Sequence, residues 1–470
     1  MSIAPEILSR LKEAVGSGGF TEDLQEIVPH VVEWRSKYQG HTPLMLKPRT
    51  TAEVSHALTI CNETQTPIVP QGGNTGLVGG QIPLGGEILL SLSRMNAIRH
   101  VHPEGMSVVA EAGVILADLQ RAAGEAGRLF PLSLASEGSC TIGGNVSTNA
   151  GGVNVLRYGN ARELVLGLEV VLADGRVLDL LRTLRKDNTG YDLKQIFVGA
   201  EGTLGIITAA ALKLFPLPSE RITAFAAVPD VQSAIGLLNA AQDSTGGLVS
   251  AFELMPRLGL ELVLAHIPQT TDPLAAPSPW YALIEVASAG AVDMRTPVMK
   301  ALEDAMENGI ATDAVIASNE AQRQAMWRLR ESLSEAQKLE GASIKHDVSV
   351  PIAAMPEFLR RGIAAVQQII PGARPVPFGH LGDGNIHFNF SAPKGGDEAA
   401  FRARWDDVNR AVHDIVREFG GSISAEHGVG VLKREEIVRT KTVAEVDIMR
   451  ALKRTLDPKN ILNPGKVVSV

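Results

Sequence analysis

The segment FGHLGDGNIHFNF contains two histidines at a spacing that could form part of a metal site. Asp383 and Gly384 are a strong turn signal, so the segment is predicted to be a hairpin in which His380 faces His387. Asn389 follows on the same face of the second arm, and the two neighbouring phenylalanines point to the opposite, core-facing side. Two imidazoles gathered on one face are suitable ligands for a divalent ion.

A carboxylate and a third histidine stand further along the chain, as Glu426 and His427 in the stretch SISAEHGVG. Two neutral imidazoles and one carboxylate, here His380, His387 and Glu426, make a ligand set for zinc or another divalent ion with open coordination positions. This site needs a fold that brings Glu426 to the hairpin. The alternative, in which both hairpin histidines are merely hydrogen-bonded surface residues, stays open on these residues alone.

Two basic residues could bind a small carboxylate. The sequence pattern places Arg330 and Ser334 one turn apart on a single helix, and Lys345 on the strand that follows. An arginine and a lysine that converge on a cleft can clamp a carboxylate, the arginine in bidentate fashion. The alternative is a solvated helix face on which Arg330 pairs with Glu331 or Glu335.

The chain has 46 glycines, and a third of them crowd into three windows, at residues 72–80, 138–159 and 190–205. The first window, GGNTGLVGG, follows a short apolar strand predicted at 67–70, and successive backbone N–H groups in such a loop can form a nest for an anion. It has neither the GK[ST] ending of a P-loop nor the GxGxxG pattern. A turn without a ligand is the alternative for this window. Together, the three windows predict a long phosphate-bearing cofactor that is held mainly by backbone.

The elements that must position these residues follow from capping signals and apolar periodicity. Thr50 and Glu53 have the spacing of a capping box, and the apolar repeat after them predicts a helix over about 51–64. Asp174 and Gly175 predict the turn of a hairpin over 163–180. The other predicted elements of this region are strands at 87–95, 107–114 and 202–216 and a helix at about 115–127.

The pattern changes after Pro216 and Pro218, where we place a domain boundary. From about residue 219 onward, strands alternate with helices, which suggests a separate domain of one sheet and its helices. In this part a helix is predicted over 320–338 and a strand over 343–351.

Composition excludes several classes of protein. The chain has 470 residues, of which 45% are hydrophobic and 20% charged, so it can bury a sizeable core and is neither disordered nor fibrous. Its net charge of −8 argues against nucleic acid as a partner. Its two cysteines, Cys61 and Cys140, are expected to be inert thiols. We find no signal peptide and no transmembrane segment, and expect a soluble, cytoplasmic protein.

The chain resembles the FAD-linked oxidases and dehydrogenases of the vanillyl-alcohol oxidase (PCMH) type, and within them the D-2-hydroxyglutarate and D-lactate dehydrogenase branch. The resemblance rests on six blocks in the right order, PQGGNTGLVGG, GGNVSTNAGG, GAEGTLGIIT, GHLGDGNIHFN, AEHGVG and LDPKNILNPGK. It implies an α+β fold. The expected parts are an N-terminal helical segment (1–40), a two-part PCMH-type FAD-binding domain (41–217), an α+β cap or substrate domain (218–430) and a C-terminal segment that returns to the FAD domain (431–470).

The resemblance also implies which residues hold FAD. In such proteins the first glycine loop binds the pyrophosphate. Relatives that tether FAD covalently at this loop use a histidine, and the nearest candidate here is Asn74, so non-covalent FAD is expected. The positions carried over to FAD binding are Pro70, Gly72, Gly73, Asn74, Thr75, Gly76, Ser136, Gly138, Thr141, Gly144, Asn145, Thr148, Gly151, Gly152, Glu201, Ile207 and Asn463.

For the reaction, the resemblance implies metal-assisted oxidation of a D-2-hydroxy acid to the 2-oxo acid, with hydride transfer from Cα to flavin N5. D-2-hydroxyglutarate is the first candidate substrate and D-malate the second. His427 is expected to be the general base. The residues that match the metal ligands are His380, His387 and Glu426, with zinc as the expected ion. Those that match substrate-binding positions are Arg330, Ser334, Lys345, Asn389 and His427.

Other functions stay open at this point. Within the same fold they are a D-lactate or glycolate dehydrogenase and, from another reaction class, an FAD-dependent ether-lipid synthase. Outside it they are an iron oxygenase with two histidines and one carboxylate as ligands, and a non-catalytic binding module. The expected electron acceptor is an electron-transfer flavoprotein or a quinone, and a homodimer is a candidate for the oligomeric state.

Overall fold

The computed structural model describes residues 3–290 and 292–470. Helices and strands are mixed along the whole of this described chain, which confirms the expected α+β class. None of the described helices combines the length and the apolar character that crossing a membrane requires. Both cysteines are buried free thiols, and burial raises the pKa of Cys61 to about 12.

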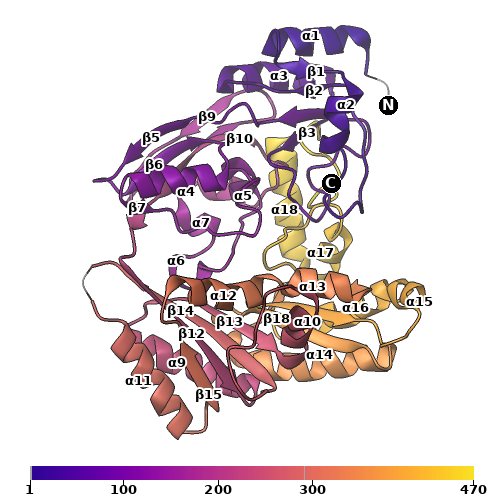
Figure 1. The fold of residues 1–470 in the computed structure, drawn as a ribbon. Helices are drawn as coiled ribbons and strands as arrows, with labels where there is room; N and C mark the ends of the chain where they lie inside the picture. Colours follow the sequence, from indigo (N-terminus) through magenta and orange to yellow (C-terminus); the bar gives the residue numbers. More distant parts are fainter. Residues whose placement is uncertain (1–2, 291) are drawn as a thin grey trace. The chain divides into compact units, whose positions relative to one another are not determined.

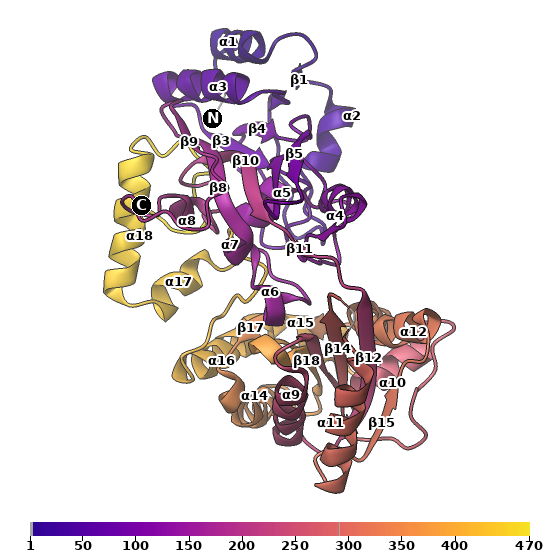
Figure 2. The same ribbon diagram turned by 90° about the vertical axis from the view of Figure 1, so that its left-hand side faces the viewer.

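The chain divides into two compact units, each built from more than one segment (Figures 1 and 2). Unit 1 runs from the N-terminus to Gly152 and also contains Gly159–Leu217 and Glu426–Val470. Unit 2 consists of Val153–Tyr158 and Pro218–Ala425.

Two sheets form the frame of unit 1. The first has four strands in the order β1 (Phe20–Thr21), β2 (Met45–Leu46), β4 (Ile88–Ser91) and β3 (Ile68–Gln71), of which the last three are parallel. The second is a five-stranded antiparallel sheet in the order β5 (Ile98–His102), β6 (Ser107–Glu111), β10 (Ile206–Lys213), β8 (Val165–Val171) and β9 (Val177–Leu180). A short ribbon pairs β7 (Arg128–Leu129) with β11 (Phe215–Pro216). Because β3 ends at Gln71, it leads directly into the first glycine window.

Capping explains where a long helix of unit 1 begins. α3 (Thr51–Thr64) follows Thr50, whose side chain accepts the Glu53 N–H at 3.2 Å, and the predicted helix over 51–64 is confirmed. α1 (Pro5–Val15) packs beside α3 in both views (Figures 1 and 2). The other helices of unit 1 are α2 (Leu24–Ile27), α4 (Leu116–Glu125), α5 (Ile142–Ser147), α7 (Ala161–Leu164), α8 (Lys194–Phe197), α17 (Arg434–Thr440), α18 (Val443–Leu456) and the 3-10 turn η1 (Val28–His30).

The hairpin expected over 163–180 is present as β8 and β9. Gly175 at its turn has a φ of 87°, a conformation that glycine adopts without steric cost. A Cβ at this glycine would also lie 2.1 Å from Thr59 Oγ1 on α3, so the turn packs tightly on that helix. The remaining predicted elements of this region correspond to β4, β6, β10 and α4, each shorter than the predicted range.

The buried Lys453 connects the C-terminal segment to the rest of unit 1 through the carbonyl of Thr203. Lys453 Nζ donates to Asp457 Oδ2 at 2.5 Å and also to the carbonyls of Thr203 (3.0 Å) and Leu462 (2.7 Å). Both charged side chains are almost completely buried, so each depends on the other for its opposite charge, while backbone groups supply further hydrogen bonds.

Unit 2 is built on one antiparallel sheet of eight described strands. Their order is β15 (Asp313–Ile316), β12 (Glu220–Val228), β14 (Trp280–Ser288), β13 (Val249–Pro256), β18 (Arg374–His380), β19 (Asn385–Ser391) and β16 (Ser343–Ile344), with β17 (Val348–Ser349) also paired to β19. The helices are α6 (Val155–Tyr158), α9 (Val231–Thr245), α10 (Arg257–His266), α11 (Arg295–Glu307), α12 (Glu320–Glu331), α13 (Leu333–Glu340), α14 (Met355–Ile369), α15 (Glu398–Ala403) and α16 (Trp405–Glu418), with 3-10 turns η2 (Ile352–Ala354) and η3 (Leu381–Asp383).

Side chains of the central strand β13 alternate between the two faces of this sheet, as a pleated strand requires. Phe252 and Leu254 belong to the core that α9, α11, α14 and α16 cover on one face. Ala251 and Met255 belong to the core that α10, α12 and α13 cover on the other. Glu253 has the same parity as the second pair, so it lies on the face that α12 covers, and it is 0% exposed.

Two predictions about this part of the chain are wrong in detail. The single helix predicted over 320–338 is two helices, α12 and α13, which meet at Ser332, so Arg330 and Ser334 lie on different helices. The strand predicted over 343–351 is interrupted, and only β16 and β17 at its two ends pair with β19.

Candidate functional site

Unit 1 contains a cavity of about 510 Å³ lined by the glycine windows. Its walls come mainly from three stretches of unit 1, at 70–81, 134–151 and 201–207, and also from Trp34, Leu92, Glu426 and His427 of the same unit. The residues expected to hold FAD that line it are Pro70, Gly72, Gly73, Asn74, Thr75, Gly76, Ser136, Thr141, Gly144, Asn145, Thr148, Gly151, Glu201 and Ile207.

Close approach of two backbone segments explains the glycines of the first loop. A Cβ on Gly72 would lie 2.3 Å from Thr141 Oγ1, and a Cβ on Gly73 would lie 2.0 Å from the Ser139 carbonyl oxygen. Any side chain at either position would push the loop away from the segment that precedes α5. The cavity wall therefore depends on glycine at both positions.

Asn74 is fixed in an unusual backbone conformation. Its φ is 54°, in the left-handed region that asparagine tolerates better than most residues. Its side-chain Nδ2 donates to the carbonyls of Pro29 (3.0 Å) and Val32 (3.1 Å), and its Oδ1 accepts from Gln81 Nε2 at 3.1 Å. Both the nitrogen and the oxygen of the Asn74 amide therefore have partners within the protein.

The second window begins a short helix that offers polar groups to the cavity. Thr141 caps α5, and its Oγ1 accepts the Gly144 N–H at 3.4 Å. Asn145 on this helix is 5% exposed and lines the cavity, and its Nδ2 has no hydrogen-bond partner among the described residues. A buried amide donor without a partner costs free energy, so a ligand with acceptor atoms would complete this site.

Glu201 is tied to the segment that follows Glu426 and His427. Its carboxylate accepts the N–H groups of Val429 at 2.7 Å and Gly430 at 2.8 Å. Burial raises the pKa of Glu201, and the two backbone hydrogen bonds only partly oppose this effect. Glu201 lines the cavity, but both of its carboxylate oxygens accept hydrogen bonds from the protein's own backbone.

The other expected residues of unit 1 lie at and near this cavity. Gly152 donates its N–H to Glu426 Oε1 at 3.1 Å, which helps to place that carboxylate. Asn463 Nδ2 donates to the Glu201 carbonyl at 2.8 Å. Gly138 lies in a turn where an added Cβ would meet nothing within 4 Å. These three residues, Gly138, Gly152 and Asn463, are not among the described residues that line the cavity.

In unit 2, Arg330 and His380 share one buried carboxylate, that of Glu253. Arg330 Nε donates to Glu253 Oε2 at 2.6 Å, and His380 Nδ1 lies 2.6 Å from Glu253 Oε1. Burial raises the pKa of Glu253, but the neighbouring charges of His380 and Arg330 outweigh this and lower it to about 2. Arg330 is buried and paired with Glu253, so it does not lie on the solvated helix face that the alternative required.

The predicted hairpin of the two histidines is present as β18 and β19. His387 pairs in register with Phe378, and His380 lies at the end of β18, directly before η3. Although the two histidines are not paired with each other in the register, their imidazole rings are neighbours, with centroids 6.1 Å apart. Both phenylalanines expected on the core-facing side, Phe388 and Phe390, are 0% exposed. The hairpin therefore brings together the two expected imidazole ligands.

The remaining expected substrate residues of unit 2 differ in exposure. Ser334 is exposed, and its carbonyl accepts from Lys345 Nζ at 3.3 Å. Asn389 is buried, with Oδ1 accepting the His346 N–H at 3.1 Å and Nδ2 donating to Gln337 Oε1 at 3.1 Å. Asn389 thus has protein partners at both ends of its amide.

Several residues of these sites were missed from the sequence, among them Glu253 and Trp34. Glu253 could have been found, because a lone carboxylate in the apolar strand SAFELMP must have a buried partner. Trp34 lines the cavity although the residue is 79% exposed. No sequence signal marks Trp34, since it comes from a loop far from the glycine windows.

Two domain families match the chain in succession. Residues 42–181 match the FAD binding domain, and residues 217–467 match the C-terminal domain of FAD linked oxidases. The chain belongs to the FAD-linked oxidase family. This membership confirms an FAD-dependent enzyme of the oxidoreductase class.

Curated relatives cover nearly the whole of this flavoprotein. It is 39% identical to the mitochondrial D-2-hydroxyglutarate dehydrogenase of Arabidopsis thaliana over 99% of this chain and 82% of the relative. It is 37% identical to the D-2-hydroxyglutarate dehydrogenase of Xanthomonas citri over 98% and 97% of the two chains. A Schizosaccharomyces pombe protein, provisionally named a mitochondrial D-lactate dehydrogenase, is 37% identical over 93% of this chain and 84% of the relative.

Solved structures show that the flavoprotein has the PCMH-type fold. p-Cresol methylhydroxylase matches with a TM-score of 0.76 and 18% identity over 99% of this chain and 96% of its own. Alkyldihydroxyacetonephosphate synthase matches with a TM-score of 0.73 and 18% identity over 98% and 85%. At such low identity these similarities concern the fold alone.

FAD fits the cavity of unit 1 by the chemistry of its walls. Backbone at Gly72 and Gly73 is exposed to the cavity without side chains, and Asn145 has an unused donor. A long ligand rich in acceptor atoms, such as a dinucleotide with its pyrophosphate, would use both features.

Proposed function

We propose that this member of the FAD-linked oxidase family oxidises D-2-hydroxy acids to 2-oxo acids, with D-2-hydroxyglutarate as its main substrate and D-malate as the second. The names of the relatives from A. thaliana and X. citri support this substrate. The structural observation that carries the proposal is that Glu426 and His427 line the same cavity as the glycine loop. A base and a carboxylate therefore stand among the residues suited to FAD.

The residues of the chain have separate tasks in this reaction. When bound, FAD supplies the acceptor of two electrons, and a divalent cation supplies positive charge beside the substrate hydroxyl. His427 accepts the hydroxyl proton as the general base. Arg330 and Lys345 hold the carboxylates of the substrate, with Ser334 and Asn389 as further polar contacts. A substrate with two carboxylates would bind both Arg330 and Lys345, whereas a monocarboxylate would bind only one of them.

We propose His380, His387 and Glu426 as the metal ligands, with zinc as the ion. The two imidazoles are neighbours on one hairpin, and two histidines with one carboxylate suit zinc with an open coordination position. Glu426 directly follows Ala425, whose N–H donates to the Asp347 carbonyl of unit 2 at 3.4 Å. This bond holds the chain to unit 2 immediately before Glu426.

The binding of FAD is proposed to be non-covalent, since Asn74 and not a histidine stands in the first loop. The proposed electron acceptor is an electron-transfer flavoprotein or a quinone. Acid denaturation followed by filtration tests the first point, because non-covalent FAD passes the filter and covalent FAD stays with the protein.

The test of the function is direct reduction of the bound flavin. The protein as purified is mixed without oxygen with D-2-hydroxyglutarate, D-malate, D-lactate or their L enantiomers, and the visible flavin band is followed. We expect bleaching with the D acids, fastest with D-2-hydroxyglutarate. The proposal would be contradicted if dithionite bleached the flavin band but none of these acids did.

The second candidate is a D-lactate dehydrogenase, and the S. pombe relative favours it. It differs in the number of carboxylates that the site must bind. Comparison of kcat/KM for D-2-hydroxyglutarate and D-lactate separates the two, because only the dicarboxylate can engage both Arg330 and Lys345.

A further inference from the structure

Glu253 occupies an unusual place for a charged side chain. It lies in the middle of β13, the central strand of unit 2, and it is 0% exposed. Across the sheet it stands directly opposite His380 in the register of β13 and β18. A buried carboxylate is tolerated only when its charge and its lone pairs are satisfied by partners.

The two oxygens of Glu253 have different partners. Oε2 accepts from Arg330 Nε at 2.6 Å, and Oε1 lies 2.6 Å from His380 Nδ1. The guanidinium of Arg330 is also held over the Phe378 ring, 5.0 Å from its centroid. Arginine stays charged in proteins, so the carboxylate beside it is kept in its ionised form.

The protonation pattern of His380 follows from these contacts. An ionised carboxylate can only accept hydrogen bonds, so the short contact to Oε1 requires a proton on Nδ1. In the neutral imidazole, Nε2 then keeps its lone pair. We propose that Glu253 is a positioning residue that holds His380 in the Nδ1–H tautomer and in the orientation in which Nε2 serves as a metal ligand.

This inference rests on the proposed function, because it takes His380 to be a ligand. A metal-bound histidine usually donates its other ring N–H to a carboxylate, carbonyl or water, and loss of such a partner typically lowers metal affinity by 10–100-fold. Glu253 would in addition connect the metal ligand His380 with Arg330, the proposed cation for a substrate carboxylate. One buried carboxylate would therefore orient two groups of the proposed site.

The substitution Glu253→Gln makes a sharp prediction. Arg330 can only donate, so it claims the single oxygen of the new amide. The NH₂ group then faces His380 Nδ1 and requires that nitrogen to accept. The proton moves to Nε2, and the nitrogen proposed to bind metal is blocked.

Glu285 provides the matched control. It lies on the neighbouring strand β14, is 4% exposed, and pairs with Arg323 (3.2 Å) and with Trp327 Nε1 (2.8 Å), both of α12. Like Glu253 it is a buried carboxylate bound to an arginine of α12. Its described hydrogen bonds do not include a histidine, so Glu285→Gln should disturb packing to a similar degree without changing His380.

The experiment measures metal affinity and tautomer in the full-length flavoprotein. Chelator-stripped wild type, Glu253→Gln and Glu285→Gln are titrated with Zn²⁺ against a chromogenic chelator. Nitrogen-15 histidine spectra of the metal-free proteins report the tautomer, with the His380 signals identified by their loss in His380→Gln. We expect Zn²⁺ affinity to fall 10–100-fold in Glu253→Gln only, together with a change of His380 from Nδ1–H to Nε2–H.

The outcomes separate this inference from the proposed function. Equal Zn²⁺ affinity in wild type and Glu253→Gln, or an Nε2–H tautomer in metal-free wild type, would overturn the role of Glu253. The second result needs no variant, so it decides the question even if Glu253→Gln fails to fold. Absence of Zn²⁺ binding by the wild type would contradict the proposed metal site, while the tautomer of His380 would still report on Glu253.

Discussion

His427 lines the unit 1 cavity beside Glu426, and its imidazole is the group that we assign to the hydroxyl proton. His427→Asn keeps a polar side chain of similar width but removes the base. We expect kcat with an artificial dye acceptor to fall by about 10²–10⁴-fold, the usual contribution of general base catalysis. The amount of FAD per chain should not change, since the proposed role is in proton transfer.

His102→Asn is the matched control for this prediction. His102 is an exposed histidine on β5 of the same unit, away from the cavity walls. It should retain the kcat of the wild type. A near-normal kcat in His427→Asn would show that another group accepts the proton.

The first glycine loop allows a second prediction at the scale of single residues. In Gly73→Ala the new Cβ would lie 2.0 Å from the Ser139 carbonyl, a fixed backbone atom, so the loop must move away from that segment. We expect the Kd for FAD to rise by at least about tenfold, equivalent to roughly 1.4 kcal/mol. Fluorescence titration of the FAD-free protein measures this.

Gly124→Ala is the control, since Gly124 lies on α4 away from the cavity walls and a Cβ there would meet nothing within 4 Å. Its Kd for FAD should equal that of the wild type. Equal losses of affinity in Gly73→Ala and Gly124→Ala would mean that close packing of the first loop is not what the cavity requires.

At the residue scale, neighbours could be predicted from the sequence where a local turn signal brings two side chains together. Two histidines around a turn were predicted to be neighbours, and their rings are 6.1 Å apart. Sequence reasoning missed Trp34, because which loop covers a cavity depends on tertiary contacts. It also missed that Arg330 is buried against Glu253, because the partner lies 77 residues away in the chain.

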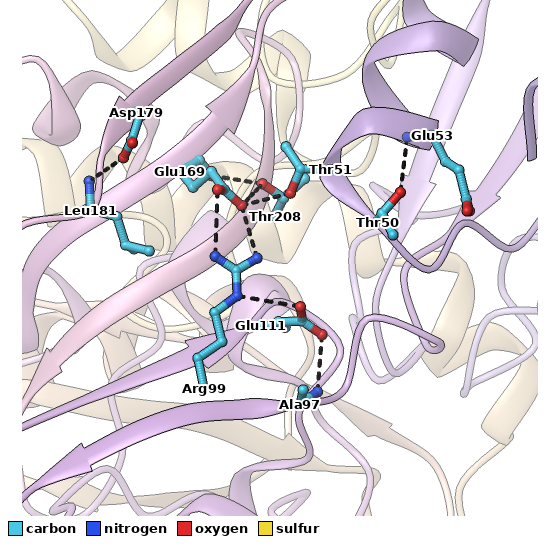
Figure 3. Close-up of polar contacts among 10 residues, drawn as sticks. All are labelled: Thr50, Thr51, Glu53, Ala97, Arg99, Glu111, Glu169, Asp179, Leu181 and Thr208. Carbon is cyan, nitrogen blue, oxygen red and sulfur yellow. Dashed lines mark hydrogen bonds and ion pairs between the residues drawn. The ribbon is translucent and has the colours of Figure 1, made fainter.

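A network of charged and hydroxyl groups connects elements of unit 1 at the next scale (Figure 3). Arg99 of β5 bridges two carboxylates, with Nε 3.3 Å from Glu111 of β6 and Nη2 3.1 Å from Glu169 of β8. Glu169 also accepts from Thr51 at the start of α3 (2.6 Å) and from Thr208 of β10 (2.9 Å). One carboxylate thus joins three strands of the five-stranded sheet to a helix.

This network predicts a pH-dependent effect of Glu169→Gln. Burial raises the pKa of Glu169, but hydrogen bonds from Arg99, Thr51 and Thr208 outweigh it and leave the pKa below its usual 4.5. A carboxylate with a lowered folded pKa stabilises the fold above the unfolded pKa and loses this effect as the pH falls through the folded value. At neutral pH we expect the variant to be less stable by roughly 1–3 kcal/mol.

Thermal unfolding measured across the acid range tests this expectation. The difference in melting temperature between wild type and Glu169→Gln should be largest at neutral pH and should shrink below about pH 4.5. Asp179→Asn is the control, because Asp179 is the exposed residue paired with Glu169 in the register of β8 and β9. A difference that stays constant with pH would show that the charge of Glu169 is not what stabilises the network.

Elements with local signals were predicted well, and those shaped by distant packing were not. α3 follows from the Thr50 cap and its apolar repeat, both of which lie within the helix and its cap. The break between α12 and α13 has no such signal, since residues 320–338 favour helix throughout. After the break, Leu333 is 1% exposed and packs so close to α10 that a Cβ on Gly259 would lie 2.9 Å from it. A contact of this kind cannot be read from the local sequence.

At the scale of the whole molecule, the two units contribute different parts of the proposed chemistry. The cavity suited to FAD is lined by residues of unit 1, whereas the two imidazoles proposed as metal ligands belong to unit 2. α6 shows how little of this division is visible in the sequence. Val153–Tyr158 lies within the second glycine window but belongs to unit 2, where it packs against β13.

Removal of the metal should therefore leave the flavin in place. We expect protein treated with a strong chelator to keep its visible flavin band, because no proposed FAD contact is made by His380 or His387. Bleaching of that band by D-2-hydroxyglutarate should be lost, while dithionite should still bleach it, and added Zn²⁺ should restore reduction by the acid. The measurement is anaerobic absorbance before chelation, after it and after Zn²⁺ is returned. Release of FAD together with the metal would show that the two sites depend on each other. If the acid still reduced the flavin at an unchanged rate after complete metal removal, the substrate hydroxyl would be activated by residues of the chain alone.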